Sequence, residues 1–166
     1  VTVPVKSLAT VINDHKIQDE YKPEGDADVF LMKLDVEGAE MKVLMSDYDL
    51  WEQRRIKFVV FEWSESVWSV TGNSLWHAQR FMFGRGYLCF MITPHSLIPI
   101  FHHFFDDVFH SNIWSNIFCG HMDDGDLLQV LKMHHATDDR MYQKVVQFLD
   151  VLSPRPPFDI PPIVDE

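Results

Sequence analysis

An almost uninterrupted apolar run, residues 28–36, most constrains the fold of this chain. Such a run is typical of a strand buried on both faces, as in parallel sheets, rather than of a strand with one face in water. Two further apolar runs, residues 56–63 and 87–93, have the same character. Amphipathic segments separate the three runs, so the order is strand, helix, strand, helix, strand. With short connections, this order predicts right-handed crossovers and a parallel α/β sheet.

The segments between the runs are predicted to be helices. The first carries apolar residues at i, i+3, i+4 and i+7, the spacing of one helix face: Met41, Leu44, Met45 and Tyr48. The second begins at Asn73 or Ser74, either of which can cap a helix, and ends at Gly84 and Gly86.

The chain then departs from this alternation. Residues 96–101 and 114–121 are apolar and rich in strand formers, so we expect one or two antiparallel strands that close the sheet edge. Helices are expected near 126–135 and 138–152.

The two ends of the chain differ from its centre. We expect a short extended piece at residues 1–5, a turn of helix at 8–12 and a polar loop at 13–27. The last segment, 153–166, holds five prolines and should be extended unless it docks. The chain therefore divides into one domain, residues 1–152, and a Pro-rich tail, residues 153–166.

The composition fits one globular domain. The 166 residues include 46% hydrophobic and 23% charged side chains, and a chain of this length can bury a core. The net charge of −11 argues against nucleic acid and anionic membrane surfaces as partners, because both attract clustered Lys and Arg. No apolar run is long enough for a transmembrane helix, and the start of the chain does not resemble a signal peptide.

Two cysteines, Cys89 and Cys119, both lie in apolar runs. Two cysteines cannot build a disulfide framework, so we interpret them as buried thiols. A single disulfide and a reactive thiol are the alternatives.

An acidic segment, residues 33–40 (KLDVEGAE), follows the first run. It places Asp35, Glu37 and Glu40 at the carboxyl end of a buried strand, the edge where open α/β sheets bind ligands. If the strand continues, Asp35 and Glu37 point to the same side. Gly38 permits a tight turn there. The alternative is structural: Asp35 caps the helix, and the two glutamates are solvated acids of its first turn.

The same segment carries a family resemblance. Residues 31–40 (LMKLDVEGAE), followed by Val43 and Leu44, resemble the signature of the FkbM-type methyltransferase family. Three shorter matches agree with it: residues 59–62 (VVFE), 83–90 (FGRGYLCF) and 115–118 (SNIF). Together these matches span about residues 28–120.

The resemblance implies a class I, S-adenosylmethionine-dependent methyltransferase with a Rossmann-like sheet, of which this chain would hold strands four to seven and their flanking helices. Members usually methylate oxygen on sugars or other small acceptors. By this resemblance Asp35 and Glu37 are the candidate catalytic residues, because a carboxylate there can orient the acceptor hydroxyl or take its proton. Glu62, at the end of the next strand, is the third candidate. Glu40 is a candidate substrate contact.

Aromatic residues flank the same edge. Trp63 and Trp68 follow the second strand and are the best candidates for an acceptor pocket, since sugars stack on aromatic faces. Trp76 and Trp114 are also near this edge, and core packing is the alternative role for all four.

One departure from the family pattern concerns the cofactor. A class I methyltransferase binds S-adenosylmethionine through a Gly-rich turn after its first strand, whereas the single Gly-x-Gly here, residues 84–86, ends a helix. The sequence therefore resembles the C-terminal half of the domain. Because the family's fourth strand pairs with its first, residues 30–34 should form an exposed apolar edge. We expect a second copy of the chain or an N-terminal half to cover it.

The histidines do not show the spacing of a metal site. No HExxH or paired CxxC spacing is present, and adjacent histidines point apart in most backbones. We therefore expect no metal at His102-His103, His110, His121 or His134-His135. The first rival hypothesis is a non-catalytic module that pairs through its open sheet edge. The second is a different α/β fold whose acidic residues bind a metal.

Overall fold

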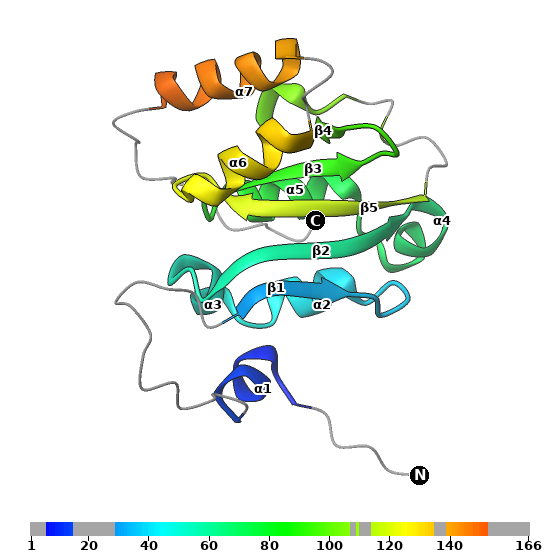
Figure 1. The fold of residues 1–166 in the computed structure, drawn as a ribbon. Coiled ribbons are helices and arrows are strands. Elements are labelled where there is room, and N and C mark those ends of the chain that lie inside the picture. Colours follow the sequence, from blue (N-terminus) through cyan, green and yellow to red (C-terminus); the bar gives the residue numbers. More distant parts are fainter. Residues whose placement is uncertain (1–5, 15–28, 107–108, 110–113, 135–138, 153–166) are drawn as a thin grey trace.

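The computed structural model describes residues 6–14, 29–106, 109, 114–134 and 139–152. In these residues five strands form one mixed sheet, in the order β1-β2-β5-β3-β4 (Figure 1). The strands are β1 (Val29–Leu34), β2 (Ile56–Ser64), β3 (Tyr87–Ile92), β4 (Leu97–Pro99) and β5 (Trp114–His121). The helices are α1 (Leu8–Asp14), α2 (Glu40–Met45), α3 (Tyr48–Glu52), α4 (Glu65–Trp68), α5 (Leu75–Phe83), α6 (Gly125–His134) and α7 (Asp139–Val151), with 3₁₀ turns η1 (Ser69–Thr71) and η2 (His102–Phe104).

The three apolar runs form strands, as predicted. β1 and β2 pair in parallel, with Leu31 beside Phe58 and Leu34 beside Phe61. β3 runs in the same direction as β2, because both are antiparallel to the strand between them. The α/β class is therefore confirmed, but the sheet is mixed rather than parallel throughout.

The position of β5 corrects one prediction. This strand was expected to close the sheet edge, yet it lies between β2 and β3 and is antiparallel to both. The short strand β4, which lies within the other predicted segment, residues 96–101, does form that edge and is antiparallel to β3, as predicted. From Ser115 onward β5 is buried or half-buried, as expected for a strand that is paired on both sides. The sequence shows that the segment is apolar, but not which strands it lies between.

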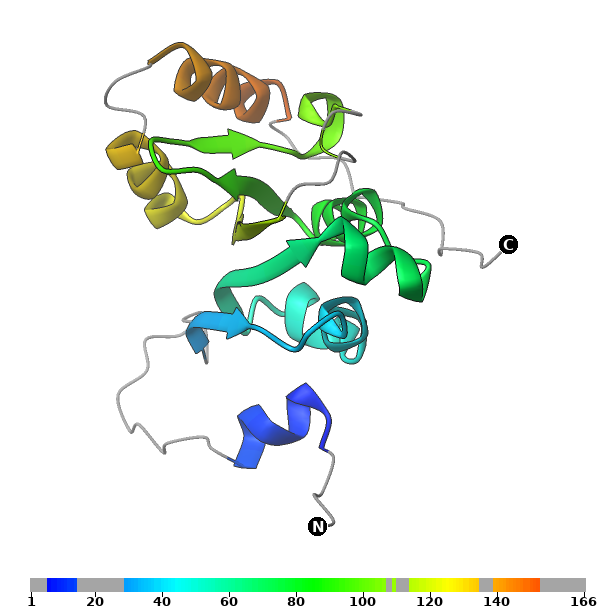
Figure 2. The same cartoon turned by 90° about the vertical axis from the view of Figure 1, so that its right-hand side faces the viewer.

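Helices cover both faces of the sheet (Figure 2). α2, α3 and α5 pack on one face, where the larger core cluster includes Trp51 and Phe61. α6 and α7 pack on the other face, where Leu131 and Val145 contact a second cluster that includes Phe118. In Figure 1, α6 and α7 lie toward the β4 side of the sheet, and β1 and β2 lie below them in the view.

The helix predicted after the first run is divided in two. Ser46 Oγ donates to the Val43 carbonyl at 2.8 Å, and Asp47 has non-helical backbone angles (φ −144°, ψ 86°), so α2 ends at Met45 and Tyr48 begins α3. The next helix begins as predicted: Ser74 is the N-cap of α5, and its Oγ accepts from His77 N–H at 3.4 Å.

Cys89 and Cys119 form a disulfide, which corrects their interpretation as thiols. They lie directly opposite each other in the antiparallel β3–β5 pair. Facing positions on neighbouring strands bring the two side chains together. This register is a property of the fold and is not visible in a separation of 30 residues.

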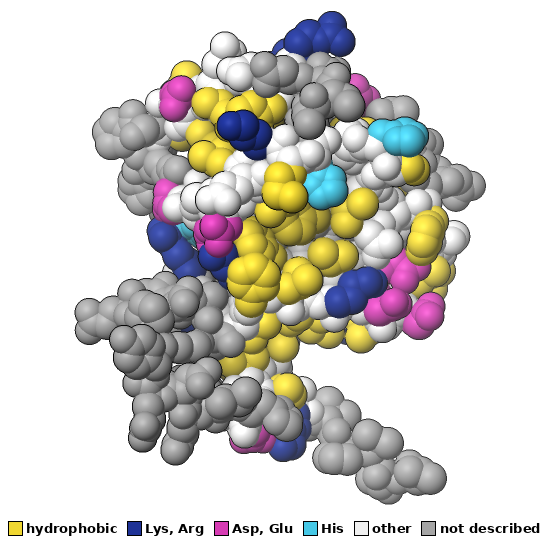
Figure 3. Space-filling model, viewed as in Figure 1, with side chains coloured by type: hydrophobic (Ala, Val, Ile, Leu, Met, Phe, Trp, Pro, Cys, Tyr) yellow, Lys and Arg dark blue, Asp and Glu magenta, His cyan; other side chains and the backbone are white. Residues whose placement is uncertain are grey.

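β1 is an edge strand among the described residues, as the resemblance implied. It pairs only with β2 there, and Phe30 and Leu31 are 66% and 53% exposed. Figure 3 shows apolar side chains gathered around β1 and β2 on this face. An exposed apolar edge can pair with another strand.

Several predictions lie outside the described residues. These are the extended piece at 1–5, most of the loop at 13–27 and the tail at 153–166, so the domain boundary at 152 stays a prediction. None of the described helices has the length and apolar character that crossing a membrane requires.

Candidate functional site

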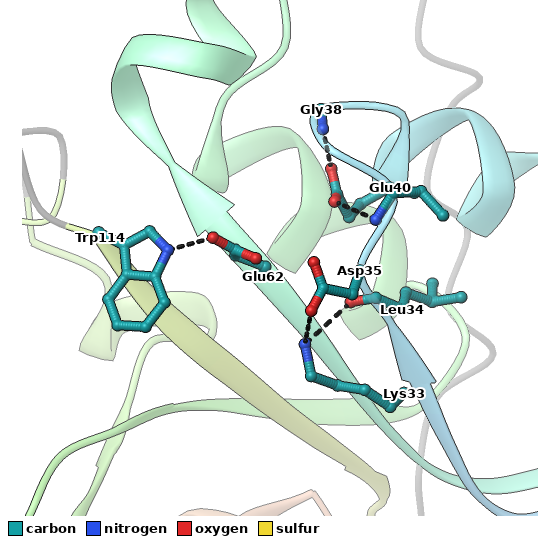
Figure 4. Close-up of polar contacts among 8 residues, drawn as sticks. Lys33, Leu34, Asp35, Gly38, Glu40, Glu62 and Trp114 are labelled. Atoms are coloured by element: carbon teal, nitrogen blue, oxygen red, sulfur yellow. Dashed lines mark hydrogen bonds and ion pairs between the residues drawn. The ribbon is translucent and has the colours of Figure 1, made fainter.

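The carboxyl ends of β1 and β2 form the candidate site (Figure 4). The last registered pair of these parallel strands is Leu34 and Phe61. The next residue along each strand is acidic: Asp35 after β1 and Glu62 in β2. Register alone therefore places two predicted catalytic carboxylates side by side at one edge of the sheet, and Figure 4 shows both in the same gap.

Asp35 lies in solvent at the start of the loop. Its carboxylate accepts from Lys33 Nζ at 3.3 Å, and Lys33 Nζ also contacts the Leu34 carbonyl at 3.3 Å. The side chains of Lys33 and Asp35 are about half exposed, so this ion pair is weak and can open for a ligand.

Glu37 and Gly38 make the turn between β1 and α2, and both have positive φ angles, 51° and 95°. A Cβ on Gly38 would lie 2.5 Å from Val67 Cγ1, so only glycine fits here. Because the strand ends before Asp35, the alternation that would place Asp35 and Glu37 on one side does not apply. Glu37 is exposed on the turn.

Glu40 supports this turn from inside. Its side chain is almost fully buried, and its carboxylate accepts three N–H groups. Oε1 accepts from Val36 N–H at 3.0 Å, and Oε2 accepts from Gly38 N–H at 2.9 Å and from Trp68 Nε1–H at 3.1 Å. Glu40 therefore fixes the loop that carries Asp35 and ties it to α4.

The aromatic residues at this edge fall into two groups. Trp63 and Trp68, predicted to line an acceptor pocket, are buried, so neither presents a surface to a ligand in this structure. Trp114 is 63% exposed, and its indole N–H donates to Glu62 Oε1. The register of β5 on β2 brings Trp114 here, opposite Ser64. The sequence places Trp114 near the edge, but only this pairing identifies it as the exposed aromatic residue of the site.

The comparisons with known proteins give one match. The family profile described as the methyltransferase FkbM domain matches residues 1–89, more than half of the chain. The chain belongs to the FkbM methyltransferase family. No curated protein and no solved structure matches it significantly. The matched region contains β1, β2 and the loop between β1 and α2, so the candidate site lies in the part of the chain that shows the family.

Membership in the FkbM family suggests S-adenosylmethionine as a cofactor, but two of the chain's glycine-containing turns are already filled by the protein's own groups. Gly84-Arg85-Gly86 lies before β3, at the sheet edge opposite the candidate site, and a Cβ on Gly86 would meet His121 Nε2 at 2.5 Å. At the site edge, Val36 N–H and Gly38 N–H already donate to Glu40. These backbone donors are therefore not available to a ligand.

Within the described residues no three His, Cys, Asp or Glu side chains gather as a metal site. The candidate site offers four groups to a ligand. These are two carboxylates, one ammonium group and one exposed indole ring, from Asp35, Glu62, Lys33 and Trp114. Carboxylates of this kind accept hydrogen bonds and protons from a hydroxyl group, and an indole ring packs against an apolar ligand face.

Proposed function

We propose that this chain carries the acceptor side of a methyltransferase site that transfers a methyl group to an oxygen of a sugar or another small molecule, with S-adenosylmethionine as the methyl donor that the family uses. The observation that supports this proposal most is the placement of Asp35 and Glu62 at neighbouring strand ends, in the family's own signature region.

The proposed roles follow from exposure. Asp35 is the general base: one carboxylate oxygen accepts the proton of the acceptor hydroxyl as that O–H bond breaks. Glu62 orients the acceptor by accepting a second hydrogen bond, and the ring of Trp114 packs against the acceptor. Glu37, on the exposed turn, is a further acceptor contact.

The buried predicted residues have a different proposed role. Glu40, Trp63 and Trp68 lie behind the acidic edge rather than on its surface. We propose that they hold the loop and do not contact the substrate. The hydrogen bond from Trp68 to Glu40 links the two elements that flank the site.

The test is an Asp35→Asn variant in the natural protein that carries this chain. Transfer of labelled methyl groups from S-adenosylmethionine to a panel of sugar and small hydroxyl acceptors is measured. We expect Asp35→Asn to lower turnover by about 10² to 10⁴, the usual contribution of a general base. Unchanged turnover would refute the role. Asp49→Asn, on α3 away from the edge, is the matched control and should keep full activity.

A second candidate function is a non-catalytic module that pairs through β1. The exposed apolar edge of β1 favours it. Calorimetry of the isolated chain with S-adenosylmethionine separates the two candidates. Micromolar binding would contradict the module hypothesis, while no binding would favour it over the enzyme.

A further inference from the structure

His102 and His103 form an unexpected pair at the other end of the molecule. Adjacent histidines were expected to point apart, yet the Nδ1 atoms of these two rings lie 3.0 Å apart. The backbone explains the difference, because His102 has a φ of 48°, in the left-handed region. That conformation turns the His102 ring toward its neighbour and costs a non-glycine residue conformational energy.

Both rings are held in place by aromatic neighbours. Phe148 of α7 lies 5.6 Å from the His102 ring and 5.2 Å from the His103 ring, measured between centroids. Phe83 contacts His102, and Phe104 contacts His103 at 4.2 Å. Figures 1 and 2 both show the turn after β4 beside α7. These contacts orient the imidazoles before any ligand arrives.

The pair is also accessible. Both histidines are exposed, and His103 lines an open cleft of about 560 Å³ together with Lys144 and Gln147. The histidine pair therefore lies at the surface, with His103 beside an open cleft.

We propose that His102 and His103 form a bidentate copper(II) site through their Nδ1 atoms. At metal–nitrogen distances near 2.0 Å, the 3.0 Å separation of the two Nδ1 atoms gives an N–metal–N angle of about 95°. This angle is closer to the right angles of tetragonal copper(II) than to the tetrahedral geometry of zinc. Copper(II) also forms the most stable complexes among divalent first-row metals.

The protonation states are consistent with binding. In the metal-free pair one Nδ1–H donates to the other Nδ1. Copper binding requires that this proton moves from Nδ1 to Nε2 of the same ring, so that both Nδ1 atoms can act as ligands. Two ligands come from the protein, and water fills the remaining positions. The Lys144 ammonium in the cleft repels a cation and so weakens its binding. We therefore expect an affinity in the micromolar range rather than a tighter one.

The test titrates the untagged full chain with copper(II) and follows binding by calorimetry and by electron paramagnetic resonance. We expect one equivalent to bind, with a dissociation constant below about 10 µM and hyperfine splitting from bound nitrogen. His103→Ala and His102→Gly should each weaken binding at least about tenfold. Glycine suits the positive φ at residue 102, so that variant should fold normally.

The matched control removes the other histidine dipeptide, His134→Ala with His135→Ala, and should leave the affinity unchanged. Three results would overturn the proposal: wild-type binding weaker than about 10 µM, equal affinity in His102→Gly, or loss of binding only in the His134 and His135 control.

Discussion

Replacement of Glu40 tests how the acidic loop is held. The Glu40 carboxylate is about 1% exposed and accepts three hydrogen bonds, from Val36 N–H, Gly38 N–H and Trp68 Nε1–H. Glu40→Ala leaves all three donors without this partner. The Trp68 donor is fully buried, whereas the two backbone donors are partly buried and can be reached by water once the carboxylate is gone.

The magnitude follows from these partners. A buried donor without an acceptor costs about 1 to 3 kcal/mol, and each hydrogen bond to a charged group contributes about 1.5 to 3 kcal/mol. Allowing for water at the two backbone donors, we expect Glu40→Ala to lower the free energy of unfolding by about 3 to 5 kcal/mol. Glu40→Gln keeps one acceptor oxygen and should cost about 1 to 3 kcal/mol.

The assay is urea unfolding followed by tryptophan fluorescence, with the slope of the transition checked for each variant. Glu37→Gln is the control, because Glu37 is exposed on the same loop, and it should change stability by less than about 0.5 kcal/mol. A cost below about 1 kcal/mol for Glu40→Ala, or equal costs for Glu40→Ala and Glu37→Gln, would refute the assigned supporting role.

Three further predictions concern the rest of the fold. Burial, opposed by Arg54 and assisted by Asp124, raises the pKa of the Tyr87 hydroxyl well above its usual value. The unfolded chain therefore loses this proton first, and the free energy of unfolding falls above about pH 10. Tyr87→Phe should reduce that alkaline decline by up to about 1.4 kcal/mol per pH unit, measured by unfolding between pH 9 and 11. Changing both Cys89 and Cys119 to alanine should lower the free energy of unfolding by about 3 to 4 kcal/mol, from the 30-residue separation, and should make stability insensitive to dithiothreitol. The isolated chain should self-associate through β1, and Leu31→Lys should shift it toward monomer in light scattering; a wild-type monomer would contradict this.

Much of the fold could be predicted because it depends on local patterns. Continuous apolar runs predicted the strands, and Ser74 and Gly84 marked the two ends of α5. The adjacency of Asp35 and Glu62 also followed, since the carboxyl ends of parallel strands share an edge. These features need only the periodicity of one segment or the direction of two strands.

What could not be predicted depends on pairing between distant segments or on single backbone angles. The disulfide and the exposed Trp114 both depend on the register of β5. The burial of Trp63 and Trp68 depends on how α4 packs. The hydrogen bonds of Glu40 could not be predicted either, because the residues before it do not form the Ser/Thr-x-x-Glu pattern of a helix capping box. The His102-His103 pair depends on one positive φ.

The central position of β5 has a consequence for folding during synthesis. β5 is the last of the described strands to leave the ribosome, but it lies between β2 and β3 in the finished sheet. Until residue 121 has been made, β2 and β3 each have an unpaired apolar edge, and the sheet can exist only as separate fragments. A nascent chain that pauses before β5 would therefore expose the unpaired apolar edges of β2 and β3, and it would depend on chaperones to avoid mispairing.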